Sequence, residues 1–287
     1  MAAILGVGVA TLDIVNEVAA YPAEDSEVRA DAQRLRRGGN AANTLEVLAQ
    51  LGHSCAWAGV WADEPDGRWI VGDLEARGVR TDTALMVEAG KSPTSYISLS
   101  RATGSRTIVH FRDLPELTSQ DLAAIDLTGY RWVHLEARPN TDEVHRMLRL
   151  IREHNPQAWL SLEVEKPRDG LAHCLHDPDV LLFSGDYARA LGFEGPEAFL
   201  RSLDPAAAPG LKVCTWGAEG AAALDNGGRM HRVAARVPER VVDTVGAGDT
   251  FNAGLIDAFV HGRHIEEALE AAADLAGRKC GQSGLEG

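Results

Sequence analysis

Short apolar runs alternate with segments of helical periodicity along most of the chain. The apolar runs that read as buried strands are Ile4–Ala10, Cys55–Trp61, Trp132–Leu135, Trp159–Val164, Val180–Phe183 and Lys212–Thr215. The segments with the spacing of an apolar helix face are Asn40–Leu51, Trp69–Arg77, Thr141–His154, Ala247–His261 and Ile265–Arg278. Strands that alternate with helices predict an α/β fold, with a mainly parallel sheet that is covered on both faces.

Two segments interrupt this alternation. Residues 13–37 are polar and include Pro22, and residues 94–111 alternate around a turn at Thr103 and Gly104. The second segment is typical of a hairpin. Because a bare hairpin is marginal in water, we expect it to need a packing partner. The pattern predicts a single domain over residues 1–287, with a small β-sheet lid built from about 13–37 and 93–112.

Composition narrows the class of protein. The chain has 287 residues and a net charge of −14, which argues against a nucleic-acid partner because such a partner requires a basic surface. No apolar run reaches the roughly 20 residues of a membrane span, and no signal peptide is evident. The four cysteines lack metal-ligand spacing, so we expect reduced thiols and a cytoplasmic location.

The most informative motif is residues 243–254, Asp-Thr-Val-Gly-Ala-Gly-Asp-Thr-Phe-Asn-Ala-Gly. Gly246, Ala247 and Gly248 allow a tight turn that opens a helix, whose unpaired N–H groups and dipole attract an anion. Asp249 would stand at the edge of this anion hole and could accept the proton of a hydroxyl group. That combination suits the phosphorylation of an alcohol. The alternative is that Asp249 only caps the helix.

A second motif, Gly38-Gly39-Asn40-Ala-Ala-Asn43, opens the first predicted helix. The glycines let a ligand approach the backbone, and Asn40 and Asn43 lie on one helical face. Their amides both donate and accept hydrogen bonds, as sugar hydroxyls require. Asp13 follows the first strand, where open α/β sheets place ligand contacts. Taken singly, Asn40 could be a helix N-cap and Asp13 a solvated loop residue.

Three weaker patterns lack a required residue. The segment that starts at Gly6 begins like a dinucleotide-binding fingerprint, but its third glycine is missing. Gly90–Ser92 is like the end of a phosphate-binding P-loop, yet the first glycine is absent and Pro93 would disrupt the following helix. Four histidines near the central strands lack metal-ligand spacing, and we interpret them as surface or core residues: His134, His145, His173 and His176.

Both motifs resemble the signatures of the ribokinase-like (pfkB) carbohydrate kinase superfamily. Within it, the chain is most similar to the ketohexokinases, the fructose 1-kinases. The stretches that carry this similarity are collinear: Tyr21–Arg29, Arg37–Asn43, Arg106–Val109, Trp132–Arg138, Val164–Arg168 and Ala276–Gly281. The resemblance implies a ribokinase-like three-layer α/β/α core with a small β-sheet lid. It also implies a homodimer in which two lids interlock.

The resemblance implies a reaction as well, the ATP-dependent phosphorylation of the primary hydroxyl of a ketose, fructose to fructose 1-phosphate. Asp249 would be the general base. Arg106, on the lid hairpin, would contact the sugar or the transferred phosphate, since its guanidinium has a fixed charge and forked donors. Asp25 belongs to the lid and could reach the partner's site. The residues that would hold the sugar are Asp13, Gly39, Asn40 and Asn43.

By the same resemblance, the nucleotide would contact Gly217, Ala218, Glu219, Gly220, Phe251 and Gly281. ATP and Mg²⁺ are the implied cofactors, and K⁺ is left open with Asp243 as its candidate ligand. Many superfamily members carry Asn-x-x-Glu where this chain has Ser184-Gly-Asp-Tyr187, so the Mg²⁺ ligands are undecided. Glu163 or Glu165 could act through water, or Glu165 could form a structural salt bridge.

Two other functions stay open. A sibling kinase for another sugar, a sugar acid or a nucleoside would use the same motifs. A catalytically silent sugar-binding protein on this scaffold would account for the missing Asn-x-x-Glu, although the intact Gly-Ala-Gly-Asp argues against it.

Overall fold

The structure, a computed structural model, describes residues 1–285 and is built on a nine-stranded sheet of order β15-β14-β13-β12-β11-β10-β1-β4-β6. Its strands are β1 (Ala3–Val7), β4 (Ser54–Ala58), β6 (Val79–Arg80), β10 (Trp132–Glu136), β11 (Trp159–Val164), β12 (Val180–Phe183), β13 (Leu211–Thr215), β14 (Ala221–Leu224) and β15 (Met230–Val233). Neighbours are parallel except at β13–β14 and β14–β15. The predicted mainly parallel sheet is confirmed.

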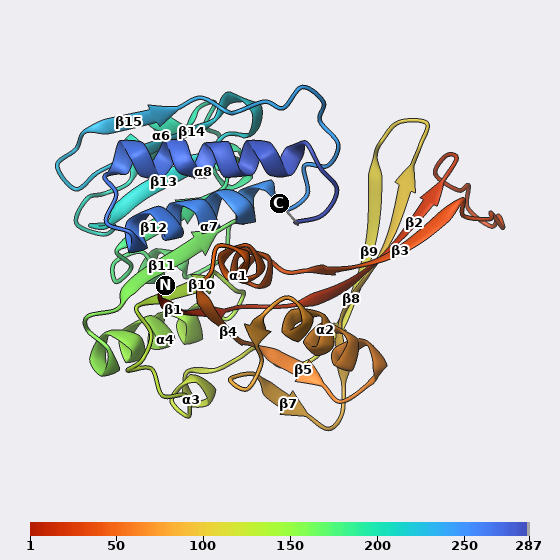
Figure 1. Cartoon of the computed structure of the whole chain (residues 1–287), viewed down its shortest axis with the longest axis horizontal. Coiled ribbons are helices and arrows are strands. Elements are labelled where there is room, and N and C mark those ends of the chain that lie inside the picture. The colour runs from red at the N-terminus through yellow and green to blue at the C-terminus, as the bar shows by residue number, and fades with distance from the viewer. Residues whose placement is uncertain (286–287) are drawn as a thin grey trace.

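Helices cover both faces of this sheet and make three layers (Figure 1). One face carries α1 (Asn40–Gln50), α2 (Pro65–Ala76), α7 (Ala247–Val260) and α8 (Ile265–Cys280). The other carries α3 (Ser119–Leu122), α4 (Thr141–His154), α5 (Gly185–Ala190) and α6 (Pro196–Ser202). Alternate residues of a strand point to opposite faces, so Leu5 of β1 enters one buried cluster and Ile4 the other.

The two polar segments form a separate four-stranded sheet that extends away from the core (Figure 1). Its order is β3-β2-β8-β9, with β2 (Thr11–Val18), β3 (Ala32–Gly38), β8 (Lys91–Ser100) and β9 (Arg106–Asp113). This sheet is called the lid below. The hairpin β8–β9 therefore packs edge to edge on β2, which supplies the partner that a lone ribbon needs.

Several predicted boundaries were wrong. Gly59 divides the predicted strand Cys55–Trp61 into β4 and β5 (Val60–Ala62), and β5 pairs with β7 (Leu85–Val87) in a small sheet of its own. The predicted helix Trp69–Arg77 begins earlier, because the Glu64 carboxylate caps it by accepting two backbone N–H groups. Among the described residues, no helix is long and apolar enough to cross a membrane.

Candidate active site

The N-terminus of α7 places Asp249 where the sequence motif predicts it. Gly246 adopts the left-handed conformation, with φ 79°, and the helix begins at the next residue. Glycine reaches this conformation without the steric cost that a Cβ atom brings. Asp249 lies in the first turn and is 7% exposed. A buried carboxylate needs hydrogen-bond partners, and the most direct one comes from α1.

Asn43 of α1 is that partner. Its Nδ2 donates to Asp249 Oδ2 at 2.7 Å, and the hydroxyl of Thr44 lies 3.3 Å from the Asp249 carbonyl oxygen. The start of α1 is fixed by Gly39, whose φ is 105°, and a Cβ atom there would lie 2.0 Å from the Val9 carbonyl oxygen. The two motifs, which are 206 residues apart in sequence at this contact, therefore meet at one place.

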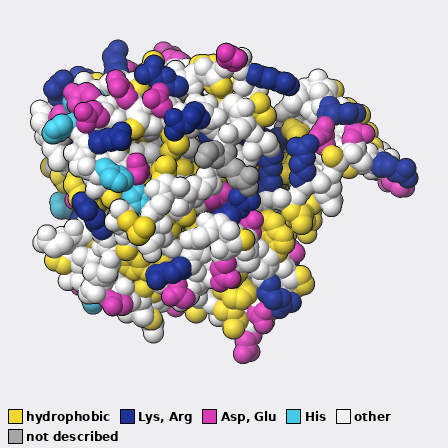
Figure 2. Space-filling model, viewed as in Figure 1, with side chains coloured by type: hydrophobic (Ala, Val, Ile, Leu, Met, Phe, Trp, Pro, Cys, Tyr) yellow, Lys and Arg dark blue, Asp and Glu magenta, His cyan; other side chains and the backbone are white. Residues whose placement is uncertain are grey.

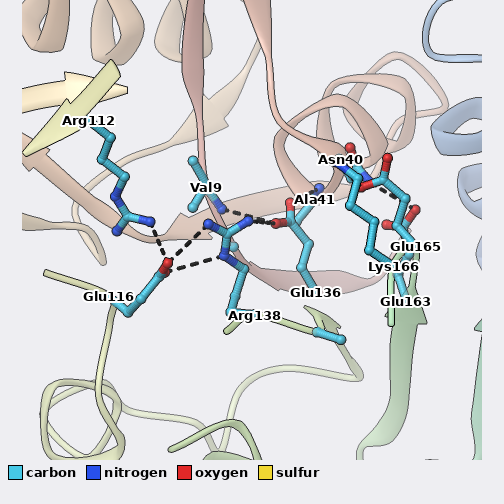
Figure 3. Close-up of polar contacts among 12 residues, drawn as sticks. Val9, Asn40, Ala41, Arg112, Glu116, Glu136, Arg138, Glu163, Glu165 and Lys166 are labelled. Atoms are coloured by element: carbon cyan, nitrogen blue, oxygen red, sulfur yellow. Dashed lines mark hydrogen bonds and ion pairs between the residues drawn. The ribbon is translucent and has the colours of Figure 1, made fainter. Parts of the chain in front are cut away.

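Two further acids lie beside this pair, at the carboxyl ends of β10 and β11. Glu163 accepts a hydrogen bond from Asn40 Nδ2 at 3.2 Å, and Glu136 accepts from the Ala41 N–H at 2.6 Å (Figure 3). The Glu136 carboxylate thus sits at the N-terminus of α1, where the helix dipole favours a negative charge. Glu136 helps to fix the helix that carries Asn40 and Asn43.

Burial sets the protonation of these acids. Burial, followed by the nearby Glu163 carboxyl, raises the pKa of Asp249 well above its usual value, and the Asn43 hydrogen bond opposes this shift. Burial also raises the pKa of Glu163 to about 8. Burial lowers the pKa of His134 to about 4, and its Nδ1 lies 2.9 Å from the Ser161 hydroxyl. His134 is therefore a neutral core residue, and the buried site increases the proton affinity of the Asp249 carboxyl.

The backbone N–H groups at the start of α7 are not equally available to an anion. The Ala247 N–H donates to the Thr244 carbonyl at 3.2 Å, so it already has an acceptor. The N–H groups of Gly248 and Asp249 also belong to the first turn of α7. A Cβ atom at Gly248 would meet nothing within 4 Å, which indicates open space above this turn. Gly248 and Asp249 are thus the better candidates for donors to an anion.

A cavity of about 300 Å³ adjoins the same turn. Of the predicted nucleotide contacts, the cavity is lined by Gly217, Ala218, Gly220 and Phe251. Its size is within the range of small-molecule sites. Glu219 and Gly281 do not line it. The cavity is also lined by the segment around Val237 and by α8, where Gly277 packs so closely that a Cβ atom would lie 2.1 Å from the Arg236 carbonyl oxygen.

Comparison with known proteins decides the family. A family model described as pfkB family carbohydrate kinase matches residues 4–286. This chain belongs to the pfkB family. Such a carbohydrate kinase is a phosphotransferase that acts on an alcohol group. Ketohexokinase of Mus musculus is 40% identical to this pfkB kinase over 99% of the chain and 98% of its own length.

Two ribokinases are more distant from this chain. Ribokinase of Bacillus subtilis (strain 168) is 26% identical over 93% of this chain and 88% of its own length. The structure of Arabidopsis thaliana ribokinase complexed with ribose and ATP superposes with a TM-score of 0.84 at 23% identity, covering 99% of this chain and 94% of that chain. The ribokinase-like fold is confirmed.

Of the predicted lid residues, Asp13 lies against the sugar motif, because a Cβ atom at Gly38 would lie 2.6 Å from Asp13 Oδ2. Asp13 of β2 accepts a hydrogen bond from the Thr11 hydroxyl at 3.1 Å and lies opposite Arg36 of β3. Arg106 is exposed at the start of β9, and strand alternation puts it on the face of the lid that Asp13 shares. Asp25 is exposed in the β2–β3 turn with φ 57°.

Asp243, the candidate K⁺ ligand, is surrounded by donors. Arg36 Nη1 donates to its carboxylate at 2.7 Å, and the buried Lys279 ammonium donates to its carbonyl oxygen at 2.7 Å. The Val245 N–H donates to the other carboxylate oxygen at 3.0 Å. Lys and Arg side chains also gather along the hollow between the lid and the core (Figure 2). An acidic protein thereby concentrates positive charge beside the anion hole.

The side chains of the segment in place of Asn-x-x-Glu make local contacts. The Ser184 hydroxyl caps α5, accepting the Tyr187 N–H at 3.0 Å. The Tyr187 ring stacks on Phe183, and the Asp186 side chain is 87% exposed and paired with Arg189. The segment therefore supplies neither the amide nor the glutamate of Asn-x-x-Glu to a Mg²⁺ ion.

Sequence reasoning missed a chain of charges beside the sugar motif (Figure 3). Glu116 accepts hydrogen bonds from both Arg112 and Arg138, and Arg138 Nη1 lies 3.7 Å from Glu136. The pKa of the Glu116 carboxyl is lowered by these two arginines against the effect of burial. Arg138 lies in the stretch that resembles the family, which was the only available signal.

One group of potential metal ligands, found among the described residues, lies at the other end of α7. It consists of His53, Asp257 and His261, and the His53 Nε2 atom lies 2.9 Å from Asp257 Oδ1. The Ala2 N–H donates to His53 Nδ1 at 3.2 Å, which leaves the ring proton on Nε2. That proton faces Asp257, so the geometry favours a structural hydrogen bond over a metal site.

Proposed function

We propose that this pfkB kinase transfers the terminal phosphoryl group of ATP to the primary hydroxyl of a ketose, converting fructose to fructose 1-phosphate. The observation that carries the proposal is the 40% identity with ketohexokinase of Mus musculus across nearly the whole of both chains. The distant ribokinases support the chemistry but not the choice of sugar.

Asp249 is the proposed general base. The buried site raises the pKa of this carboxyl, which strengthens it as an acceptor for the proton of the attacking hydroxyl. The donor Asn43 keeps the carboxylate aimed by a 2.7 Å hydrogen bond. Asn40, Asn43, Gly39 and Asp13 are the proposed sugar contacts, because their amide and carboxylate groups match hydroxyls that donate and accept.

The nucleotide is proposed to enter as MgATP, with its base in the 300 Å³ cavity and its terminal phosphate at the start of α7. The N–H groups of Gly248 and Asp249 would stabilise charge on the moving phosphoryl group. Arg106 of the lid would add a positive charge once the lid covers the site, and the closed lid would exclude water, a competing acceptor.

A homodimer through the lid is part of this proposal. The register places Leu35, Ile14, Tyr96 and Val109 in one row across the four strands. Three of these side chains are 47–65% exposed, which is typical of an interaction surface. Light scattering after size-exclusion chromatography should give the mass of a dimer. An active monomer would contradict this part alone.

We also propose a cytoplasmic location, which suits four free thiols.

The test is an ADP-release assay over ketoses, aldoses and nucleosides, with product identification by NMR. We expect the highest kcat/KM with fructose and a phosphate at its first carbon. Preference for an aldose or a nucleoside would contradict the ketose but retain the kinase. Sugar binding without turnover on any acceptor would favour the silent protein. Purified Asp249→Asn protein, assayed in parallel, controls for contaminating kinases.

A further inference from the structure

Arg37 is a charged residue in an unusual place. It stands near the end of β3, directly before the Gly38-Gly39-Asn40 turn, and its side chain is only 2% exposed. A buried guanidinium is costly unless acids and hydrogen bonds compensate it. The partners of Arg37 therefore show what its burial achieves.

Two acids balance the charge of Arg37. Its Nε donates to Asp73 at 3.1 Å, and its Nη2 donates to Glu46. A second arginine, Arg77, binds the same two acids from the outer side, donating to Glu46 at 2.6 Å and to Asp73 at 3.2 Å. Two positive and two negative groups thus neutralise one another. The remaining bond of Arg37 leads toward the candidate active site.

That bond runs from Arg37 Nη1 to Asn43 Oδ1, at 2.8 Å. The other end of the same amide, Nδ2, donates to Asp249 Oδ2 at 2.7 Å. Rotating the amide by half a turn would bring its oxygen against the Asp249 carboxylate and its NH₂ group against the guanidinium. Both contacts would be repulsive. Arg37 therefore allows only one orientation of the Asn43 amide.

We propose that Arg37 is a positioning residue for phosphoryl transfer, which holds the Asn43 amide so that it donates to the carboxylate of Asp249. The proposal rests on the proposed role of Asp249 as the base. The other ionisable groups that act on Asp249 are carboxyls, those of Glu163, Glu136 and Glu165, and each disfavours its ionised form. The Asn43 N–H is the side-chain donor that opposes them, so its orientation affects how readily the base ionises.

The test compares pH profiles of kcat for Arg37→Met and the unmodified enzyme. Without Arg37 the Asn43 amide can turn away from Asp249, and Asp249 then becomes harder to ionise. Activity that depends on the ionised form of Asp249 therefore requires a higher pH. We expect the acidic limb to move up by about one pH unit. KM for the nucleotide should be unchanged. Arg37→Lys retains the charge and one donor direction, so its acidic limb should lie between those of Arg37→Met and the unmodified enzyme.

Two comparisons separate positioning from stability. In an Asn43→Ala background, Arg37→Met should move the limb no further, because the amide through which it acts is gone. The matched control is Arg77→Met, which removes a partner of the same two acids without contacting Asn43. It should lower the unfolding free energy and leave the limb unmoved. Equal shifts from both arginines, or a full shift in the Asn43→Ala background, would overturn the proposal.

The remaining outcomes distinguish this proposal from the proposed function. If Asp249→Asn keeps its turnover, the base assignment fails and the Arg37 proposal fails with it. If Asp249→Asn is inactive but Arg37→Met has an unshifted limb, only the Arg37 proposal is overturned. Should Arg37→Met not fold, the Arg37→Lys profile decides, and a limb that coincides with that of the unmodified enzyme overturns the proposal.

Discussion

In the core, Asn43 and Asp249 are buried and joined by a 2.7 Å hydrogen bond, whereas Arg106 and Asp25 of the lid are exposed to solvent. The core residues come from helices that pack on one sheet, so the fold itself fixes their separation. The lid residues lie on a sheet that extends away from the core (Figure 1). For these lid residues to reach Asp249, as the proposed mechanism requires for Arg106, the lid would have to move or a second copy of the chain would have to bring its own lid. Under the proposed mechanism, the core would supply the reacting groups, and the lid would supply groups that are added to them.

Replacing the proposed base should have the largest effect. Asp249→Asn keeps the shape of the side chain but removes its proton acceptor, so we expect kcat to fall by about 10²- to 10⁴-fold. Sugar binding, measured by calorimetry, should persist. Asp257→Asn is the matched control, since Asp257 lies on the same helix but bonds to His53. Near-normal turnover by Asp249→Asn would contradict the role of Asp249 as the base, and the groups of the lid would then have to be tested for that role.

Stability should differ between the two regions. Leu48 of α1 is fully buried, while Ile108 of β9 is 54% exposed. Leu48→Ala should lower the free energy of unfolding by about 2–5 kcal/mol, and Ile108→Ala by less than about 1 kcal/mol. Denaturant titration at low protein concentration measures both. A large loss at Ile108 would show that the lid shares the stability of the core or is buried in an assembly.

The pH dependence of stability should report Glu163. Its pKa is about 8 in the folded chain against an ordinary value of 4.5. The folded state therefore binds this proton more tightly, and the resulting stability is full below pH 4.5 and is lost as the pH rises to about 8. Glu163→Gln cannot ionise, so from pH 6 to pH 9 its unfolding free energy should fall less than that of the unmodified enzyme, by roughly 2 kcal/mol. Parallel pH curves for the two proteins would contradict the raised pKa.

The smallest expected effect concerns Arg106. Arg106→Gln should lower kcat by about tenfold, because one charge that stabilises the transferred phosphoryl group is lost. The free energy of unfolding should stay within about 0.5 kcal/mol, as is usual for an exposed position. Arg101→Gln, an exposed lid arginine paired with Asp31, is the control and should keep its kcat. If both variants behave alike, Arg106 has no special role in transfer.

Much of the core could be predicted from sequence because its pattern is strong. The helix Thr141–His154 and the strands Trp159–Val164 and Val180–Phe183 have the predicted bounds, since each combines a clear apolar period with polar flanks. The break at Gly59 could not be found in an uninterrupted apolar run. It follows from tertiary packing, since a Cβ atom there would lie 2.5 Å from the Gly8 carbonyl oxygen. The strand Ala221–Leu224, which lies next to the edge strand β15, is short and without alternation.

The candidate site was predictable only where a motif marks it. The motifs indicate Asn43 and Asp249 separately, and packing of α1 on α7 brings them together. Arg37 lies in a stretch that resembles the family, but nothing in the sequence indicates its burial, because an arginine at the end of a polar strand is typical of a solvated position. Its burial depends on Glu46 and Asp73, which come from two different helices. The sequence also could not indicate that the Ala247 N–H is already bonded, since its acceptor lies within its own turn.

Arg36 has a mechanical consequence. It belongs to lid strand β3, yet its guanidinium grips Asp243, ahead of α7, and Ser283, beyond α8. Movement of β3 would either break these two hydrogen bonds or displace the loop that precedes α7. If the proposed sugar and nucleotide sites each act on these contacts, binding of the two ligands would be coupled, and thermodynamic reciprocity would require each to alter the affinity of the other by an equal factor.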